Sequence, residues 1–368
     1  MRVVRVAAIA AAFGVFLAVP HAAAPIPHAA LVSAPPLALN GAVDSNSPVM
    51  WDLEDGQRKL FVLTSHSGVP SISMGSAVDR LSPSTPITIT PHPGYGVWME
   101  AIVSDDVDTW YGFYHNEWPA SRCGREDRAV PRIGAARSHD RGRTWEDIGT
   151  VIQARRGTSA CDSTNKYVIG GVGDLSVMLD PDKNYLYFFY SQYQEDADAQ
   201  GVAVARLQWA DRDRPWGKIE LWRDGVWDPD EGRRQLMEGL PGQPRRLEWT
   251  YPAATPLVAP SLPWHDGDDK VDAFWGPSVH WNTAIEQYVM LLNRAKDESY
   301  TQEGIYVSFA PRLDDPSLWS APQKIMNGGK WYPQVIGSTD GLGTDKLAGA
   351  SARFFMSGKS DWMINFTR

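Results

Sequence analysis

A hairpin unit that recurs five times along the chain constrains the fold more than any other feature. In each copy, a short apolar run leads through a turn into an aromatic-rich run that ends in polar residues. Short alternating or continuous apolar runs bounded by Gly, Pro, Asp and Asn are typical of β-strands. First strands are predicted at 47–52, 100–105, 174–180, 277–282 and 333–337, and their partners at 59–66, 109–117, 185–192, 287–294 and 352–358.

The repeated units predict an all-β chain folded as a five-bladed β-propeller. The fifth unit has three recognisable strands at most, so residues 30–39 are expected to add a strand and close the ring, because closure removes exposed sheet edges. An open β-sandwich is the alternative, but it does not need five similar units. Residues 222–272 are expected to form a long loop over one face. Third strands are predicted at 71–78, 132–138, 202–208 and 304–309, each followed by a more exposed fourth segment.

The N-terminal residues have the pattern of an export signal. Residues 1–5 are basic, residues 6–19 form an unbroken apolar stretch, and residues 22–24 supply small side chains for cleavage. We therefore predict a signal peptide at 1–24 and a single propeller domain at 25–368. The mature protein is expected to be secreted or periplasmic, monomeric and without stable membrane association. An uncleaved N-terminal anchor is the alternative.

The cysteine content and the net charge restrict which cellular compartment and which classes of binding partner fit this chain. An exported chain meets an oxidising compartment, so the two cysteines, Cys123 and Cys161, are predicted to form a disulfide; two separate buried thiols are the alternative. The formal net charge of −9 argues against a phosphate-backbone partner, which requires clustered Lys and Arg. No nucleic acid is expected to bind.

Residues 138–145, Ser-His-Asp-Arg-Gly-Arg-Thr-Trp, resemble the Asp box of sialidases and related propellers. Asp140 is expected to accept backbone N–H groups, Gly142 to adopt a positive φ, and Trp145 to pack inward. The segment lies between a third and a fourth strand, so we interpret it as structural. Residues 316–322 occupy the same place in the fourth blade and receive the same interpretation.

Candidate functional residues lie where first strands start and second strands end, because an antiparallel hairpin brings these two points to one face. That face is the mouth of the central channel. The strand starts contribute three acids as catalytic candidates: Asp44, Glu100 and Asp174. The strand ends contribute the candidates for substrate binding: His66, His115, Glu117, Gln192 and Arg294.

Converging carboxylates fit glycoside hydrolysis, which needs a proton-donating acid and a second carboxylate as base or nucleophile. Crowding helps to keep one of them protonated, because a nearby like charge raises the pKa of a carboxyl group. Aromatic residues near these points could stack on sugar rings, although packing inside a blade explains any single one of them more simply. These residues are Trp51, Trp98, Tyr114, Trp118, Trp275 and Trp331.

The blade arrangement over residues 40–368 resembles the five-bladed glycoside hydrolases of families 43, 32 and 117, which act mainly on furanosides or on anhydro-galactose sugars. The family-43 pattern implies an Asp base, an orienting Asp and a Glu general acid in the first three blades. Asp44 matches the first of these, whereas Glu100 and Asp174 have the acid identities exchanged. We assign Asp44 as base or nucleophile, Glu100 as general acid and Asp174 as orienting carboxylate, with Glu117 as the reserve acid. The implied substrate is a poly- or oligosaccharide, such as arabinan.

No catalytic metal or other cofactor is expected, and a structural calcium ion is left open. Asp105, Asp106 and Asp108 sit in a hairpin turn and lack a full ligand loop. His280 could face the channel, where family members sometimes hold calcium, but a hydrogen-bonded core histidine is the simpler interpretation.

Two other functions are compatible with such a fold. A sialidase would need three Arg residues around the substrate carboxylate, and the strand ends offer Arg294 only. A propeller that binds sugar or protein without catalysis is the second alternative, because a fold does not determine a function.

Overall fold

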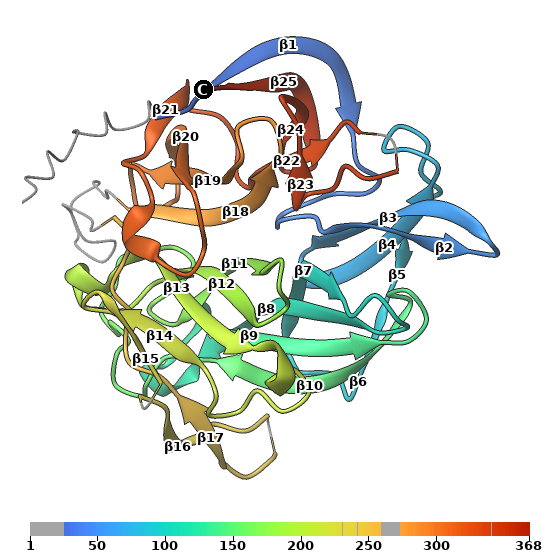
Figure 1. The fold of residues 1–368 in the computed structure, drawn as a ribbon. Helices are drawn as coiled ribbons and strands as arrows, with labels where there is room; N and C mark the ends of the chain where they lie inside the picture. The colour runs from blue at the N-terminus through green and yellow to red at the C-terminus, as the bar shows by residue number, and fades with distance from the viewer. Residues whose placement is uncertain (1–25, 230, 241, 259–272, 340) are drawn as a thin grey trace, which may run out of the picture.

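The computed structural model describes residues 26–229, 231–240, 242–258, 273–339 and 341–368, so the predicted signal peptide at 1–24 lies outside the described residues. Five antiparallel blades surround a central axis, which confirms the five-bladed propeller (Figure 1). The alternative of an open β-sandwich is wrong. No helix in the described part of the chain has the length and hydropathy of a membrane span.

The first three blades follow the predicted hairpin order. Blade 1 contains β2 (Val49–Glu54), β3 (Gln57–His66), β4 (Val69–Gly75) and β5 (Thr85–Pro86). Blade 2 contains β7 (Gly96–Ser104), β8 (Trp110–Ala120), β9 (Arg125–Ser138), β10 (Thr144–Ile152) and the short parallel β6 (Thr88–Thr90). Blade 3 contains β11 (Val172–Leu179), β12 (Tyr185–Gln192), β13 (Gly201–Gln208), β14 (Glu220–Arg223) and β15 (Val226–Asp228).

Blades 4 and 5 complete the ring, and blade 5 contains strands from both ends of the described chain. Blade 4 contains β18 (Phe274–Asn282), β19 (Gln287–Ala295), β20 (Gln302–Ala310), β21 (Gln323–Asn327) and β23 (Leu347–Ala348). Blade 5 contains β22 (Pro333–Gly337), β24 (Ser351–Met356), β25 (Lys359–Thr367) and β1 (His28–Ala38). Strand β1 pairs antiparallel with β25, which confirms that an N-terminal strand closes the ring (Figure 1).

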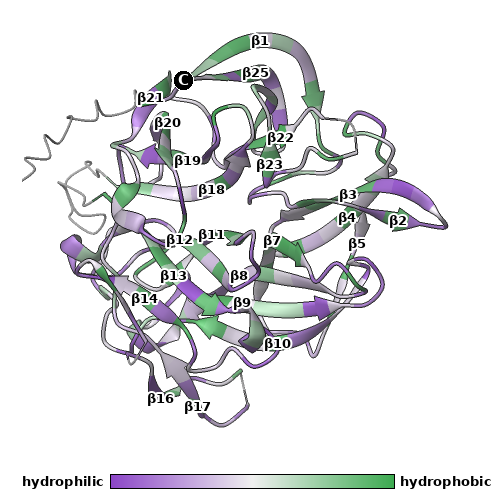
Figure 2. Ribbon diagram, in the orientation of Figure 1, coloured by the Kyte–Doolittle hydropathy of each residue, from purple (hydrophilic) through white to green (hydrophobic). Residues whose placement is uncertain are grey.

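Apolar side chains fill the spaces between neighbouring blades. Phe61 of blade 1 packs edge-to-face on Trp110 of blade 2, with ring centroids 5.3 Å apart. Phe113 of blade 2 packs in the same way on Phe188 of blade 3, at 5.0 Å. Hydrophilic residues gather instead at exposed ends such as the β2–β3 turn (Figure 2). The core is therefore a set of wedges between blades rather than one central cluster.

Bulges interrupt the inner strands of three blades. The register shifts between Met99 and Ala101 in β7, between Gly173 and Leu175 in β11, and between Trp275 and Ser278 in β18. A bulge bends a strand and re-aims a side chain. Glu100 and Asp174 lie at the first two bulges rather than at the strand starts where we expected them. The reason is that pairing extends beyond each acid to the channel mouth.

The prediction of a long loop at 222–272 is wrong for the described part of that segment. It continues from β14 into β15, and it also contains a two-stranded hairpin of β16 (Arg233–Met237) and β17 (Arg246–Thr250). Trp249 and Tyr251 pack beside blade 3, and this apolar anchorage gives the hairpin its place. The predicted disulfide between Cys123 and Cys161 is present, and it ties the β8–β9 end to the loop after β10.

Residues 138–145 form the turn between β9 and β10. The carboxylate of Asp140 accepts hydrogen bonds from the backbone N–H groups of Arg143 (3.1 Å) and Thr144 (2.9 Å). Gly142 has a φ of 81°, a conformation that favours glycine, and Trp145 is buried against blade 1. The turn lies away from the channel mouth and plays a structural part.

Candidate active site

A pocket opens at the mouth of the central channel, where the inner strands of the blades converge. The inner strands and their partners supply three of its acids, the segment before β2 supplies the fourth, and the loops beside the strands supply most of its aromatic rings. Its lining consists of Asp44, Trp98, Glu100, His115, Glu117, Tyr167, Val168, Asp174, Tyr193, Trp275, Tyr300, Trp331 and Tyr332. All three predicted catalytic acids therefore meet in one pocket, together with His115 and Glu117.

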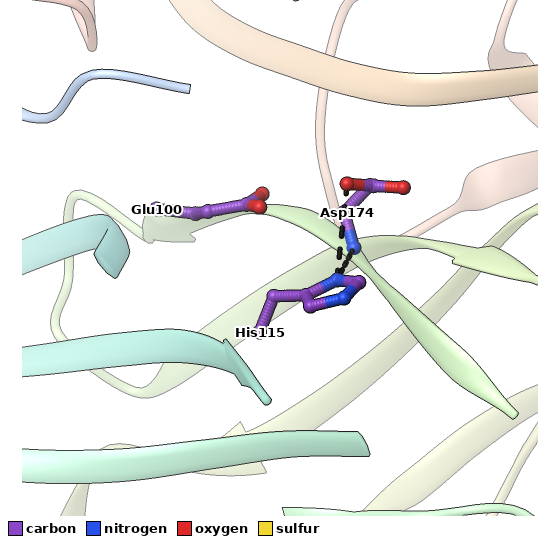
Figure 3. A group of neighbouring side chains, drawn as sticks. All are labelled: Glu100, His115 and Asp174. Atoms are coloured by element: carbon purple, nitrogen blue, oxygen red, sulfur yellow. Dashed lines mark hydrogen bonds and ion pairs between the residues drawn. The ribbon is translucent and has the colours of Figure 1, made fainter. Parts of the chain in front are cut away.

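Glu100, His115 and Asp174 form the buried centre of this pocket (Figure 3). One carboxylate oxygen of each acid and one ring nitrogen of His115 all lie within 4.8 Å of one another. The backbone N–H of Asp174 donates to Nδ1 of His115 at 2.9 Å, and the Asp174 carboxylate lies 3.8 Å from the same nitrogen. Oε2 of Glu100 accepts the backbone N–H of Leu175 at 2.6 Å. The two bulged strands thus hold both acids against one imidazole ring.

Burial gives the two acids unusual proton affinities. Desolvation raises the pKa of Glu100 well above its usual range, and the nearby Asp174 carboxylate raises it further. Desolvation also raises the pKa of Asp174, although His115 and the Tyr193 hydroxyl oppose this shift. The two adjacent carboxyl groups therefore titrate as a pair, and the protonated form of each is favoured relative to an exposed acid.

His115 connects the buried acids with Glu117 at the pocket surface. Burial opposes its protonation, but the hydrogen bond to Glu117 and the charge of Asp174 outweigh burial and raise the pKa of His115 to about 9. Nε2 of His115 lies 3.4 Å from Oε1 of Glu117. Since Nδ1 accepts the Asp174 N–H, the first ring proton belongs on Nε2, and a second proton would have to displace that N–H. His115 therefore orients Glu117 and Asp174 simultaneously.

Asp44 precedes β2 and lies at the edge of the pocket with a side chain that is one-third exposed. Its Oδ1 accepts the indole N–H of Trp98 at 2.7 Å, and its Oδ2 accepts the backbone N–H of Ser67 at 3.0 Å. Nδ1 of His66 lies 3.4 Å from the same Oδ2. These contacts fix the carboxylate while leaving it accessible from the pocket, in contrast to Glu100, which is only 1% exposed.

Sequence reasoning missed the tyrosines that surround Asp174. The Tyr193 hydroxyl donates to Oδ2 of Asp174, and the Tyr332 hydroxyl donates to Oδ1 at 3.2 Å. Tyr193 directly follows a second strand and Tyr332 directly precedes a first strand, so the strand-end rule extended by one residue would have found both. Tyr167 and Tyr300 come from loops and carry no comparable signal.

Three residues of the pocket have left-handed backbone conformations that side chains disfavour. The φ angles are 39° at Asp174, 58° at Tyr300 and 56° at Tyr332. Each such residue costs about 1–3 kcal/mol and persists only where its surroundings impose it, most often at functional sites. This concentration of strain around one carboxylate supports the assignment of the pocket as the candidate site.

Three residues that we expected to bind substrate do not line the pocket. Gln192 is fully buried. Its side-chain N–H groups donate to the carbonyl oxygens of Ala199 and Ala254, and its Oε1 accepts the backbone N–H of Ala254, so it holds these two loops together. Arg294 donates to the Tyr306 hydroxyl at 3.1 Å, because the alternation of β19 turns it away from the channel. His66 is more than half exposed and contacts the pocket only through Asp44.

The predicted aromatic residues divide into two groups. Trp98, Trp275 and Trp331 line the pocket. The other three have structural contacts instead: Trp51 donates to Gly343 O, Tyr114 donates to Asp147, and Trp118 stacks on Arg132. The interpretation of packing inside a blade therefore fits half of the set.

Metal binding can be considered from the donor atoms alone. Glu100, His115 and Asp174 would offer a cation three ligands, but it would compete with the backbone N–H groups that Glu100 and His115 already accept. The interpretation of His280 as a hydrogen-bonded core histidine is wrong. The ring is buried, but neither of its nitrogens has a hydrogen-bond partner among the described residues. Burial, assisted by Lys346, lowers the pKa of His280 to about 3, so this ring is neutral.

Comparison with protein-family models and with the sequences of curated proteins gives no match. A thermostable family-43 glycoside hydrolase aligns over 90% of this chain and 92% of its own, at 12% identity and a TM-score of 0.49. The endo-arabinase of Bacteroides thetaiotaomicron aligns over 90% and 96%, at 8% identity and 0.44. The α-L-arabinanase of Penicillium chrysogenum aligns over 90% and 85%, at 12% identity and 0.45. Similarity at this level assigns neither a substrate nor a residue role to this chain.

Proposed function

We propose that this protein is a glycoside hydrolase that cleaves a poly- or oligosaccharide by paired-carboxylate catalysis. The observation that carries the proposal is the presence, in one aromatic-lined pocket, of carboxyl groups in contrasting environments. Glycoside hydrolysis needs one carboxyl group that holds a proton and another that does not. Burial of Glu100 and Asp174 favours the first condition, whereas the exposure of Asp44 and its two N–H donors favour the second.

Each acid receives a role from its surroundings. Asp44 acts as base or nucleophile, since Trp98 and Ser67 hold its oxygens at the edge of the pocket. Glu100 acts as general acid, because burial beside Asp174 favours its protonated form. Asp174 is the orienting carboxylate, and its charge favours the protonated form of Glu100. Glu117, whose side chain is 39% exposed, is the reserve acid if Glu100 does not reach the leaving group.

We propose that the enzyme is exported from the cytoplasm. A disulfide between Cys123 and Cys161 supports an oxidising compartment, which fits a secreted or periplasmic enzyme. Furanosides such as arabinan are the first substrates to examine, since the sequence resembles hydrolases of that kind. We propose that the protein acts as a monomer.

The proposal is tested with a panel of arabinans, fructans, galactans and sialosides. We expect reducing sugar from at least one neutral polymer, and we expect Asp44→Asn and Glu100→Gln each to lower kcat about 10²–10⁴-fold on it. The matched control is Glu146→Gln, since Glu146 is exposed and pairs with Arg137 outside the pocket. If wild-type protein released no sugar from any polymer yet still bound one, a non-catalytic binding propeller would replace the hydrolase.

A further inference from the structure

The ionisable side chains that line the pocket are mostly acidic. Its described lining contains four carboxyl groups, those of Asp44, Glu100, Glu117 and Asp174. His115 is the only basic side chain among these lining residues, and no Lys or Arg accompanies it. Acidic groups thus outnumber the one basic group by four to one in a pocket largely walled by aromatic rings, which favours a net negative charge.

Two cations in the blades around this pocket have partners outside its lining. Arg132 stacks on Trp118, 3.9 Å from the ring centroid, and pairs with Glu248 on the other face of β8. Lys346 contacts Ser176 at 2.8 Å and Asp345 at 3.2 Å, deeper along the axis. Neither side chain lines the pocket. The lining itself therefore offers its carboxylates no Lys or Arg partner, although His66 contacts Asp44 from outside it.

Aromatic rings form much of the remaining wall of the pocket. Tyr167, which is 45% exposed, packs edge-to-face on Trp331 and Tyr300, with ring centroids 5.7 and 5.6 Å apart. Trp331 also packs edge-to-face on Trp275. Rings that meet at right angles present both edges and faces, and the face of an aromatic ring attracts a cation. Any ring face that is presented to the pocket would favour a positively charged group.

We infer that this pocket selects sugars by charge, binding amino sugars more tightly than neutral sugars and rejecting uronic, sialic and sulfated ones. The inference rests on the proposed function for the ligand being a sugar, and on the lining residues for its charge. An anionic sugar would bring like charge to Asp44 and Glu117 without any guanidinium to receive it. An ammonium group would instead find acceptors in both carboxylates.

Calorimetry with galactosamine, galactose and galacturonate, and with the corresponding glucose series, tests this order. At about pH 6, where an amine of ordinary pKa is protonated, we expect the amino sugar to bind about tenfold more tightly than the neutral sugar. Galacturonate should bind at least about tenfold more weakly, and added salt should compress both differences. Glu117→Gln should narrow the gap between amino and neutral sugars, whereas Glu146→Gln should leave it unchanged.

The outcomes separate this inference from the proposed function. Equal affinity for the three sugars, or tighter binding of the uronate, would overturn charge selection even if neutral polymers were cleaved. The expected order without cleavage of any polymer would support charge selection and overturn the hydrolase. Absence of binding by every sugar in both series would overturn charge selection, and the hydrolase would fall with it only if no polymer were cleaved.

Discussion

Individual residues of the pocket have environments or backbone conformations that reduce the stability of the folded state. Glu100 loses its hydration and receives a single backbone N–H in exchange, and Asp174 adopts a left-handed backbone while two tyrosine hydroxyls hold its oxygens. Unfavourable terms of this kind persist where the surrounding structure over-determines them. A substitution that relieves one of these terms should therefore stabilise the fold, whereas an ordinary core substitution destabilises it. It should also change the pKa values of the neighbouring acids.

The first prediction concerns Glu100→Gln. The raised pKa of Glu100 means that the folded state binds its proton more tightly than the unfolded state does. The stability that Glu100 contributes is thus complete below its unfolded pKa, near 4.5, and is lost as pH rises through the folded pKa. Glutamine keeps an acceptor for the Leu175 N–H and does not ionise. We expect the variant to have a higher Tm than wild type at neutral pH, by an amount that shrinks toward pH 4.5.

Thermal denaturation across this pH range measures the effect, with Glu146→Gln as the control. Each unit by which folding raises the pKa corresponds to about 1.4 kcal/mol above the folded pKa. A difference in Tm between variant and wild type that stayed constant with pH would show that Glu100 is not the titrating group.

The second prediction concerns Tyr332→Phe. Its hydroxyl donates to Asp174, and this hydrogen bond lowers the pKa of that carboxyl against the effect of burial. Removing the donor should raise the pKa of Asp174, move the acidic limb of the kcat profile to higher pH, and lower kcat about tenfold. The control is Tyr111→Phe, which removes a similar hydrogen bond to Asp213 outside the pocket. An unshifted profile would limit Tyr332 to packing.

Turns and bulges are the elements that place these residues. The bulges in β7 and β11 bend the inner strands so that their acids face the channel, while the turn at 138–145 only joins two outer strands. Inner and outer elements of one blade therefore serve different purposes. Damage to an outer turn should reduce stability without changing the pocket.

The third prediction applies this distinction to Asp140→Ala. The substitution removes acceptors for the Ser138 hydroxyl (2.8 Å) and for two backbone N–H groups of the turn. We expect the free energy of unfolding to fall by about 1–3 kcal/mol, as measured by urea denaturation. Specific activity of the folded protein, or sugar affinity by calorimetry, should equal that of wild type. A large loss of affinity in folded protein would contradict the structural role of the turn.

The whole molecule is stabilised by closure of the ring through β1. Ala29 and Leu31 of this strand pack on the core of blade 5, and its backbone pairs with β25. Without β1, the strand β25 would become an unprotected edge. Both ends of the described chain thus meet in one sheet, which couples the last blade to the first residues.

The fourth prediction follows from this closure. A chain that begins at residue 39 should show a Tm lower by roughly 5–10 °C than one that begins at residue 26, since each kcal/mol shifts Tm by about 2–4 °C in domains approaching this size. It should also self-associate through the exposed edge, which light scattering detects. Unchanged Tm and scattering would mean that β1 is dispensable.

The sequence by itself determined the fold and most of the pocket. Five similar hairpins specify five blades because strand alternation and turn residues are local properties, and antiparallel pairing then brings Asp44, Glu100, His115, Glu117 and Asp174 to one mouth. Only the tertiary structure decided which face each side chain takes and what surrounds it. Successive side chains of a strand point to opposite faces, and the sequence did not show that Arg294 and Gln192 lie outside the pocket lining. Bulges and loop tyrosines have no local signature, and burial of the acids depends on blades that are distant in sequence.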